Sequence, residues 1–166
     1  QKYAAIIIRE LHAIDKEKHI GVKMTILIIH GSPRNGNTLK LVEKYKTAMV
    51  QKAEVSFEYI NVNDLNLHMC NGCFACVTKG EHFCPLKDDN VKLVIEKMDQ
   101  TDGAIFAAPT YMYSIPAVMK NLIDRLAYLG HRPKCINKYA VVLSTTYEVG
   151  LKNALKYLSL GIAWAW

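Results

Sequence analysis

Residues 24–38 read MTILIIHGSPRNGNT and join an apolar segment to a polar turn and the start of a periodic segment. Met24–His30 is short, almost entirely apolar and rich in isoleucine, which is typical of a parallel strand covered on both faces. The turn that follows combines glycine, proline and asparagine with hydroxyl side chains. Apolar residues at helical spacing begin at Leu39. This stretch therefore predicts a strand, a polar loop and a helix in succession.

The same alternation recurs along the chain. Residues 55–62, 103–108 and 139–144 also resemble strands, and stripes of apolar residues at helical spacing separate or follow them. Strands that alternate with helices favour right-handed βαβ units and an α/β fold with a doubly wound parallel sheet in three layers, here of four or five strands. Ligands of such sheets bind beyond the carboxyl ends of the strands. We therefore expect the chemistry in the loops after His30, Val62, Ala108 and Ser144.

Composition excludes several classes of protein. The 166 residues are 51% hydrophobic, and 21 basic against 15 acidic residues give a net charge of +6. No apolar run reaches the roughly 20 residues of a membrane span, and residues 4–8 are too short for a secretory signal. The positive residues are scattered along the chain, which disfavours nucleic acid as a partner. We expect a cytoplasmic protein without a membrane partner.

The loop at residues 31–38 has the features of an anion site. A loop between a strand and a helix presents free backbone N–H groups and the positive end of the helix dipole. Polar side chains that could assist come from Ser32, Arg34, Asn37 and Thr38. The spacing resembles a P-loop, but Asn37 stands where a P-loop has lysine, so a single terminal phosphate fits better than a triphosphate. The simpler interpretation is a polar turn in which Asn37 or Thr38 caps the helix.

The loop at residues 109–116 reads PTYMYSIP and leads into the helix expected at residues 117–129. Tyr111, Met112 and Tyr113 could line a flat, partly apolar ligand while backbone N–H groups bind its polar edge. Alternatively, these side chains simply pack the loop against the protein. Asp124-Arg125, on the helix itself, is expected to be an exposed or paired dyad.

Cysteines cluster between the second and third predicted strands. Cys70, Cys73 and Cys76 follow one another at C-x-x-C spacing, Cys84-Pro85 comes next, and Cys135 stands apart. Glycines nearby allow the loop to turn. This spacing favours the ligand set of a [4Fe–4S] cluster, because a zinc site usually splits its ligands into two separated pairs. A zinc clip and a loop of reduced thiols are the alternatives, and Cys135 is expected to be a plain core or loop thiol.

The pairing of GSPRNGNT with PTYMYSIPAVMKNLIDR resembles the flavodoxin-like NAD(P)H-dependent FMN reductase superfamily, and the Cys-rich segment resembles its iron–sulfur flavoprotein branch. The resemblance implies FMN, with its phosphate at Ser32, Arg34, Asn37 and Thr38. It places the flavin ring along Pro109, Thr110, Tyr111, Met112 and Tyr113, with Thr145 and Thr146 closing the other side. Residues 145–150 depart from the family pattern because they contain less glycine.

The resemblance implies a function and a domain organisation. We expect an FMN-dependent oxidoreductase or electron-transfer flavoprotein, linked to NAD(P)H or ferredoxin, with a [4Fe–4S] cluster on Cys70, Cys73, Cys76 and Cys84. A homo-oligomer, dimer or tetramer, is expected, with a small molecule or a protein as electron donor and acceptor. No side chain is obviously required as an acid or base. The alternatives are a cluster-free FMN reductase, a redox-sensing carrier with a zinc or thiol loop, and a nucleotide-binding regulator.

Residues 24–166 are expected to form the flavodoxin-like domain, without its last strand or helix. Residues 1–23 carry a helical apolar stripe and are predicted to be a helical extension. One hypothesis places this helix where a C-terminal helix of the sheet would lie. The other packs it elsewhere or in a partner.

Overall fold

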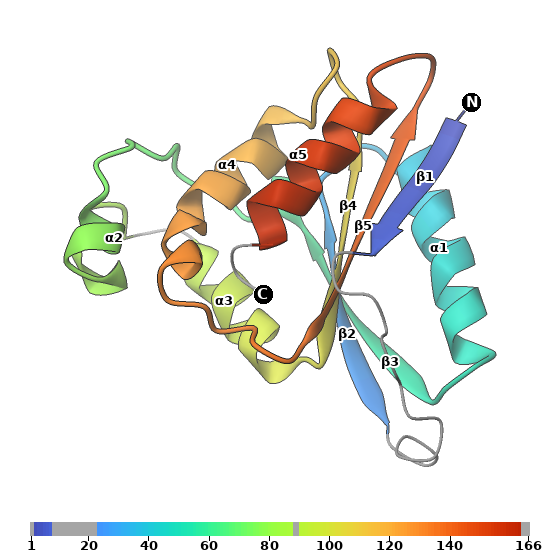
Figure 1. Cartoon of the computed structure of the whole chain (residues 1–166), viewed down its shortest axis with the longest axis horizontal. Coiled ribbons are helices and arrows are strands. Elements are labelled where there is room, and N and C mark those ends of the chain that lie inside the picture. The colour runs from blue at the N-terminus through green and yellow to red at the C-terminus, as the bar shows by residue number, and fades with distance from the viewer. Residues whose placement is uncertain (1, 8–22, 88–89, 164–166) are drawn as a thin grey trace.

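The computed structural model of the chain describes residues 2–7, 23–87 and 90–163 (Figure 1). Four parallel strands form the body of the sheet: β2 (Met24–His30), β3 (Val55–Asn61), β4 (Gly103–Pro109) and β5 (Tyr139–Thr146). The helices are α1 (Asn37–Val50), α2 (Ala75–Thr78), α3 (Val91–Gln100), α4 (Ala117–Arg125) and α5 (Leu151–Ala163). Short 3₁₀ turns are η1 (Val62–Asp64), η2 (Glu81–Phe83) and η3 (Ala127–Gly130). The predicted α/β fold is confirmed.

The sheet has the strand order β1-β5-β4-β2-β3. β2 lies between β3 and β4 and runs parallel to both, and β4 runs parallel to β5. The chain reverses direction across the sheet between β3 and β4, because β3 and β4 lie on opposite sides of β2. This switch places the loops after β2 and β4 next to each other, where α/β proteins bind ligands.

The predicted helix at the start of the chain is wrong for the residues that the structure describes there. β1 (Lys2–Ile7) is a strand that pairs antiparallel with β5, from Lys2 opposite Thr146 to Ile7 opposite Val141. A short run rich in alanine and isoleucine is compatible with the periodicity of a helix and with that of a strand. The otherwise unpaired edge of β5 provides backbone hydrogen-bond partners, which favour the strand. The segment therefore supplies a fifth strand of the sheet, and α5 follows β5 as the last described helix. The remainder of the expected extension, residues 8–22, lies outside the described residues.

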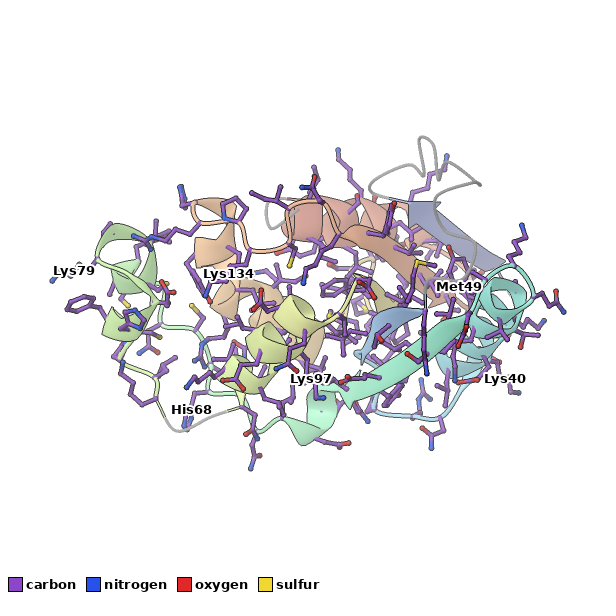
Figure 2. The ribbon with its side chains drawn as sticks, turned by 90° about the horizontal axis from the view of Figure 1, so that it is seen from below. Lys40, Met49, His68, Lys79, Lys97 and Lys134 are labelled. Atoms are coloured by element: carbon purple, nitrogen blue, oxygen red, sulfur yellow. The ribbon has the colours of Figure 1, made fainter. Side chains whose placement is uncertain are left out.

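Helices cover the two faces of the sheet unequally. Leu27, Ile29 and Phe106 point to the face that is covered by α3, α4 and α5, while Ile28 and Ile105 point to the face covered by α1. Figure 1 shows α1 on one side of the molecule and α2 on the opposite side, next to α3 and α4. In the view of Figure 2, Lys79 marks the end that carries α2, and Lys40 of α1 lies at the other end. None of the described helices is long and apolar enough to cross a membrane.

Candidate functional site

Three polar loops meet at the carboxyl edge of the sheet. They are residues 31–38 (the phosphate loop), 109–116 (the ring loop) and 145–150 (the closing loop), which follow β2, β4 and β5. Parallel register brings them together, because the ends of these strands lie side by side. The amide of Gly31 donates to the carbonyl of Ala107 at 2.8 Å, which extends the pairing of the strands into the first loop.

The phosphate loop leaves backbone donors free at the start of α1. The helix begins after Gly36, no side chain caps it, and its first hydrogen bond runs from Lys40 N–H to the Gly36 carbonyl at 3.1 Å. Neither Asn37 nor Thr38 serves as the cap that the simpler interpretation requires. Ser32 is buried and holds the turn, since its hydroxyl donates to the Arg34 carbonyl at 2.9 Å and accepts from the Arg34 amide at 3.2 Å. Uncapped N–H groups at a helix start are suitable donors for an anion.

Hydroxyl groups join the phosphate loop to the other two loops. The Thr38 and Thr145 hydroxyls lie 2.8 Å apart, and both side chains are buried. The Thr110 amide donates to the Thr145 carbonyl at 2.7 Å, so Thr145 contacts both neighbours. Arg34 also reaches the ring loop, with its Nη2 3.5 Å from the Tyr111 hydroxyl. The structure therefore brings together Ser32, Arg34, Thr38, Thr110, Tyr111 and Thr145 from the predicted set.

The ring loop presents apolar side chains outward. Tyr111 and Ser114 exchange backbone hydrogen bonds of 2.8 and 2.9 Å, which close a tight turn around Met112 and Tyr113. Both residues of this turn have positive φ, 42° and 65°. Met112 is 91% exposed and Tyr113 is 58% exposed, so they do not pack the loop against the protein. The turn holds two residues in strained backbone conformations with their side chains exposed beside the phosphate loop.

The closing loop lies directly on the ring loop. Thr146 donates to the Val149 carbonyl at 2.6 Å, and Gly150 follows with φ of +82°. A Cβ added at Gly150 would lie 2.7 Å from Tyr113 Cα and 3.0 Å from Thr110 Cγ2. The low glycine content of this loop did not reveal that its one glycine, Gly150, is the position where the two loops touch.

His30 ends β2 immediately before the phosphate loop and is fully buried. Its Nδ1 lies 2.7 Å from the Tyr59 hydroxyl, and within the described part of the chain its Nε2 has no hydrogen-bond partner. Burial lowers the pKa of His30, which favours the neutral ring at physiological pH. A neutral histidine bonded to a tyrosine supports the strand end without adding charge to the anion site.

The Cys loop, residues 68–87, lies beside α4. Cys70, Cys73, Cys76 and Cys84 all line one small cavity of about 30 Å³, together with Asp124 and Arg125 of α4. Gly72 has φ of +62° and Phe74 has φ of 55°, and these two turns direct the chain around Cys73. The fold thus brings the four predicted ligands to one place. Cys135 is buried in the core outside this loop, as expected, and burial raises its pKa to about 11.

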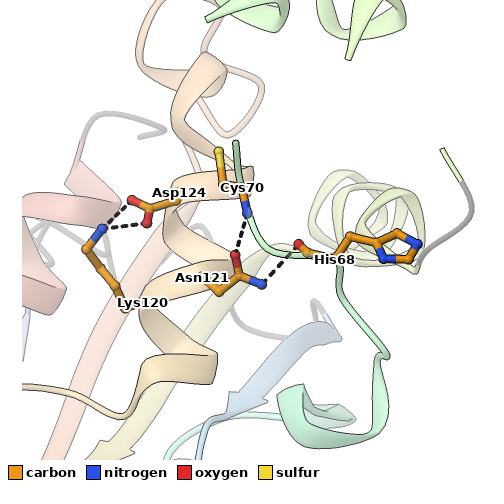
Figure 3. Close-up of polar contacts among 5 residues, drawn as sticks. All are labelled: His68, Cys70, Lys120, Asn121 and Asp124. Carbon is orange, nitrogen blue, oxygen red and sulfur yellow. Dashed lines mark hydrogen bonds and ion pairs between the residues drawn. The ribbon is translucent and has the colours of Figure 1, made fainter. Parts of the chain in front are cut away.

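Two buried residues of α4 hold the Cys loop in place. The Asn121 side chain accepts from the Cys70 amide at 3.0 Å and donates to the His68 carbonyl at 3.1 Å (Figure 3). Arg125 donates to the same His68 carbonyl at 3.0 Å and to the Leu86 carbonyl at 3.4 Å, so it binds both ends of the loop. The expected dyad is therefore divided: Asp124 pairs with Lys120, whereas Arg125 is buried under the loop.

Asn121 was not predicted to be a functional residue, and Arg125 was predicted only as half of an exposed or paired dyad. The one sequence feature that marks these two residues is their spacing: polar side chains four residues apart interrupt the apolar stripe of the helix. That spacing places both side chains on one face but does not reveal which segment covers the face. The partners lie 39 to 57 residues away in sequence, a separation that only the tertiary structure bridges; Asn121 and Arg125 reach His68, Cys70 and Leu86.

The model of the family described as NADPH-dependent FMN reductase matches residues 24–164. The chain belongs to this family. The membership confirms the resemblance inferred from the loops after β2 and β4. In this FMN reductase family protein, the matched region contains the phosphate, ring and closing loops and the whole Cys loop.

Curated relatives carry the name of the branch that the Cys-rich segment resembles. An iron–sulfur flavoprotein of Archaeoglobus fulgidus is 37% identical over 132 residues, which cover 78% of this chain and 61% of that protein. An iron–sulfur flavoprotein of Clostridioides difficile is 36% identical over 131 residues, covering 75% and 55% of the two chains. The chain thus spans little more than half the length of these relatives.

Solved structures confirm the fold. The NAD(P)H:quinone oxidoreductase of Methanothermobacter marburgensis superposes on the chain with a TM-score of 0.65 at 18% identity, covering 86% of this chain and 78% of that one. At this identity the similarity concerns the arrangement of strands and helices. It shows that the FMN reductase family protein shares the α/β fold of that structure.

Proposed function

We propose that the protein is an FMN-dependent oxidoreductase that carries a [4Fe–4S] cluster on its Cys loop. The proposal rests on one observation: all four loop cysteines line one cavity beside α4. This is the same helix that begins directly after the ring loop. When bound, FMN would accept a hydride from a reduced nicotinamide, or electrons from a ferredoxin, and the cluster would exchange single electrons with it.

The phosphate loop has the groups that FMN needs. Free N–H groups at the start of α1 and the hydroxyls of Ser32 and Thr38 would bind the phosphate, with Arg34 supplying positive charge and Asn37 an amide donor. Tyr111, Met112 and Tyr113 would line one side of the flavin ring, with Pro109 and Thr110 beneath them. Thr145 and Thr146 would close the other side, because the closing loop contacts Thr110 directly.

The donor set at the Cys loop matches the four-cysteine ligand set of a cluster. Cys70, Cys73, Cys76 and Cys84 all line the cavity. Ligands of one zinc ion must all lie about 2.3 Å from the same point, whereas the four cysteines of a cluster bind different iron atoms. Burial and the neighbouring Cys84, Cys70 and Cys73 raise the pKa of Cys76, which indicates that the thiols are near one another.

The two cofactor sites lie at opposite ends of one helix. Residues 117 and 125 of α4 are about 12 Å apart at 1.5 Å per residue, with the ring loop before the first and the Cys cavity beside the second. The side chains of Asn121 and Arg125 fix the Cys loop to this helix, so the distance between the two sites is set by a rigid element.

We also propose that the protein acts as a homo-oligomer, dimer or tetramer. Large apolar side chains around the flavin loops are exposed in the single chain, with Met112 at 91% and Tyr147 at 89%. Exposed apolar residues that gather at a site are typical of a surface covered by a partner. A second copy would shield the flavin ring from water.

The absorption spectrum of anaerobically purified protein, with analysis of iron and acid-labile sulfide, tests the proposal. Flavin bands together with a broad iron–sulfide shoulder, and iron and sulfide in equal amounts, are the expected result. Flavin bands without iron would leave a cluster-free reductase, and zinc in place of iron would identify a zinc clip. A colourless protein that takes up no added FMN would refute the proposal.

Replacing Gly150 by alanine should weaken FMN binding. The new Cβ would lie 2.7 Å from Tyr113 Cα, so the closing and ring loops must move apart. Alanine would also have to adopt the positive φ of residue 150, which it rarely does. We expect the Kd for FMN, measured by fluorescence quenching, to rise on the order of tenfold. Gly80→Ala is the control, because Gly80 also has a positive φ, +127°, but lies in the Cys loop outside the flavin site, and a Cβ there would lie no nearer than 3.8 Å to Phe83. Equal affinities in both variants would show that the flavin does not lie between the loops.

Replacing Asn121 by aspartate should reduce occupancy of the cluster. The carboxylate can still accept from the Cys70 amide, but its second oxygen would face the His68 carbonyl, where Asn121 now donates at 3.1 Å. Two facing acceptors repel, so the start of the Cys loop should detach from α4. Iron per protein should fall while bound flavin stays constant. Unchanged iron content would show that α4 does not position the loop.

A further inference from the structure

The hydroxyl of Tyr128 is buried and has no partner within the described residues. Tyr128 lies in η3, is 3% exposed, and its oxygen forms no hydrogen bond to the described chain. Buried hydroxyls nearly always have a hydrogen-bond partner, and an unpaired one is costly. A phenylalanine would fill the same space without this cost. The hydroxyl therefore indicates an acceptor that the described residues do not supply.

The surroundings of Tyr128 place it at the Cys loop. Tyr128 lines a cavity of about 400 Å³ together with Cys76 and Cys84, the two less exposed cysteines of the loop. Arg132, just after η3, donates to the carbonyls of Cys76 at 2.8 Å and Val77 at 3.2 Å. These bonds tie α2, which contains Cys76, to the segment that carries Tyr128.

The protein groups near Tyr128 are poor candidates for its acceptor. The carboxylate of Glu81 is paired with Lys134 at 3.4 Å. Burial raises the pKa of Cys135 to about 11, so this sulfur is a neutral thiol and a weak acceptor. Burial, with Glu81, Cys76 and Cys135 nearby, also raises the pKa of Tyr128 to about 12, so its hydroxyl keeps its proton. What the site offers is a protonated donor beside two cysteines.

We propose that the Tyr128 hydroxyl donates a hydrogen bond to a sulfur of the cluster held by Cys76 and Cys84, and so raises the reduction potential of that cluster. The inference rests on the proposed function, since it requires the cluster. Hydrogen bonds to cluster sulfurs are a recognised control of cluster potential. Added negative charge on reduction strengthens a hydrogen bond to sulfur, so the donor stabilises the reduced state more than the oxidised state. Tyr128 is thus a positioning and tuning residue, outside the flavin site.

The test compares Tyr128→Phe with Tyr45→Phe in anaerobically purified protein. Tyr45 is a partly buried tyrosine on α1, packed against the opposite face of the sheet, and controls for the loss of a hydroxyl. A redox titration followed by electron paramagnetic resonance reports the midpoint potential of the cluster directly. We expect Tyr128→Phe to shift the midpoint to a lower value and to speed loss of iron to a chelator, while Tyr45→Phe changes neither.

Stability of the cluster-free protein gives a second readout. Because the hydroxyl has no hydrogen-bond partner among residues 2–7, 23–87 and 90–163, Tyr128→Phe should leave the melting temperature of the iron-free protein unchanged or higher. An unchanged midpoint potential, or destabilisation of the iron-free protein, would overturn the role of Tyr128 while the proposed function stands. Wild-type protein that holds flavin without iron and sulfide would instead refute the cluster, and this inference with it.

Discussion

Replacing Cys73 by serine should abolish the cluster and leave FMN bound. Cys73 lies between two residues of positive φ, Gly72 and Phe74, and its exposed side chain lines the cysteine cavity. Serine matches cysteine in shape, so the loop keeps its conformation, but an un-ionised hydroxyl is a poor ligand for iron. Iron and acid-labile sulfide should fall to background, and the broad shoulder should disappear from the spectrum.

The flavin should be unaffected because none of its proposed contacts involves the Cys loop. The phosphate, ring and closing loops are joined by bonds among Thr38, Thr110 and Thr145, whereas Cys73 lines a cavity with Asp124 and Arg125 at the end of α4. Cys135→Ala is the matched control, since this thiol is buried in the core outside the loop and should keep both cofactors. Simultaneous loss of flavin and iron in Cys73→Ser would show that the loop is chiefly structural. Full iron content would exclude Cys73 as a ligand.

Replacing Asn37 by aspartate should weaken FMN binding on the order of a hundredfold. Asn37 is the first residue of α1, where the free N–H groups of the helix begin. A carboxylate there has almost the same shape but carries a negative charge beside the proposed phosphate. Two charges about 5 Å apart at an effective dielectric constant near 20 repel by about 3 kcal/mol, which corresponds to roughly two powers of ten in Kd. Titration of FMN into flavin-free protein measures the change.

The same substitution should not harm the flavin-free protein. An acidic residue in the first turn interacts favourably with the helix dipole, typically by about 0.3–1 kcal/mol, so the melting temperature should stay constant or rise. Asn137→Asp is the matched control, because Asn137 is an exposed turn residue two positions before β5, at the opposite edge of the sheet. If Asn37→Asp binds FMN as tightly as Asn137→Asp, the phosphate does not lie at the start of α1.

Local sequence predicted most of the fold because apolar spacing follows the periodicity of the backbone. The four parallel strands lie within two residues of their predicted ends. The helix expected at residues 117–129 divides into α4 and η3, a change of geometry that a stripe of apolar residues does not reveal. The prediction of a helix at the start of the chain was wrong for Lys2–Ile7, because six residues rich in isoleucine and alanine fit a helix or a strand equally well.

In the candidate site, too, the features set by residues close in sequence were predictable and the contacts between distant segments were not. Spacing along the chain was sufficient to single out the loop after β2 and the cysteine set as candidates, because both depend on residues close in sequence. The contacts of Asn121 with Cys70, of Gly150 with Tyr113, and of the Tyr128 segment with Cys76 could not be predicted, since each joins segments that are distant in sequence.

The amino-acid sequence by itself determined the alternation of strands and helices, the edge of the sheet at which the loops gather, and the residue types that those loops carry. Only the tertiary structure decided that β1 completes the sheet beside β5, and that α4 holds the Cys loop through Asn121 and Arg125. The physical reason is that periodicity and turn chemistry act between neighbours in the chain. The pairing of a buried polar group depends instead on which distant segment packs against it.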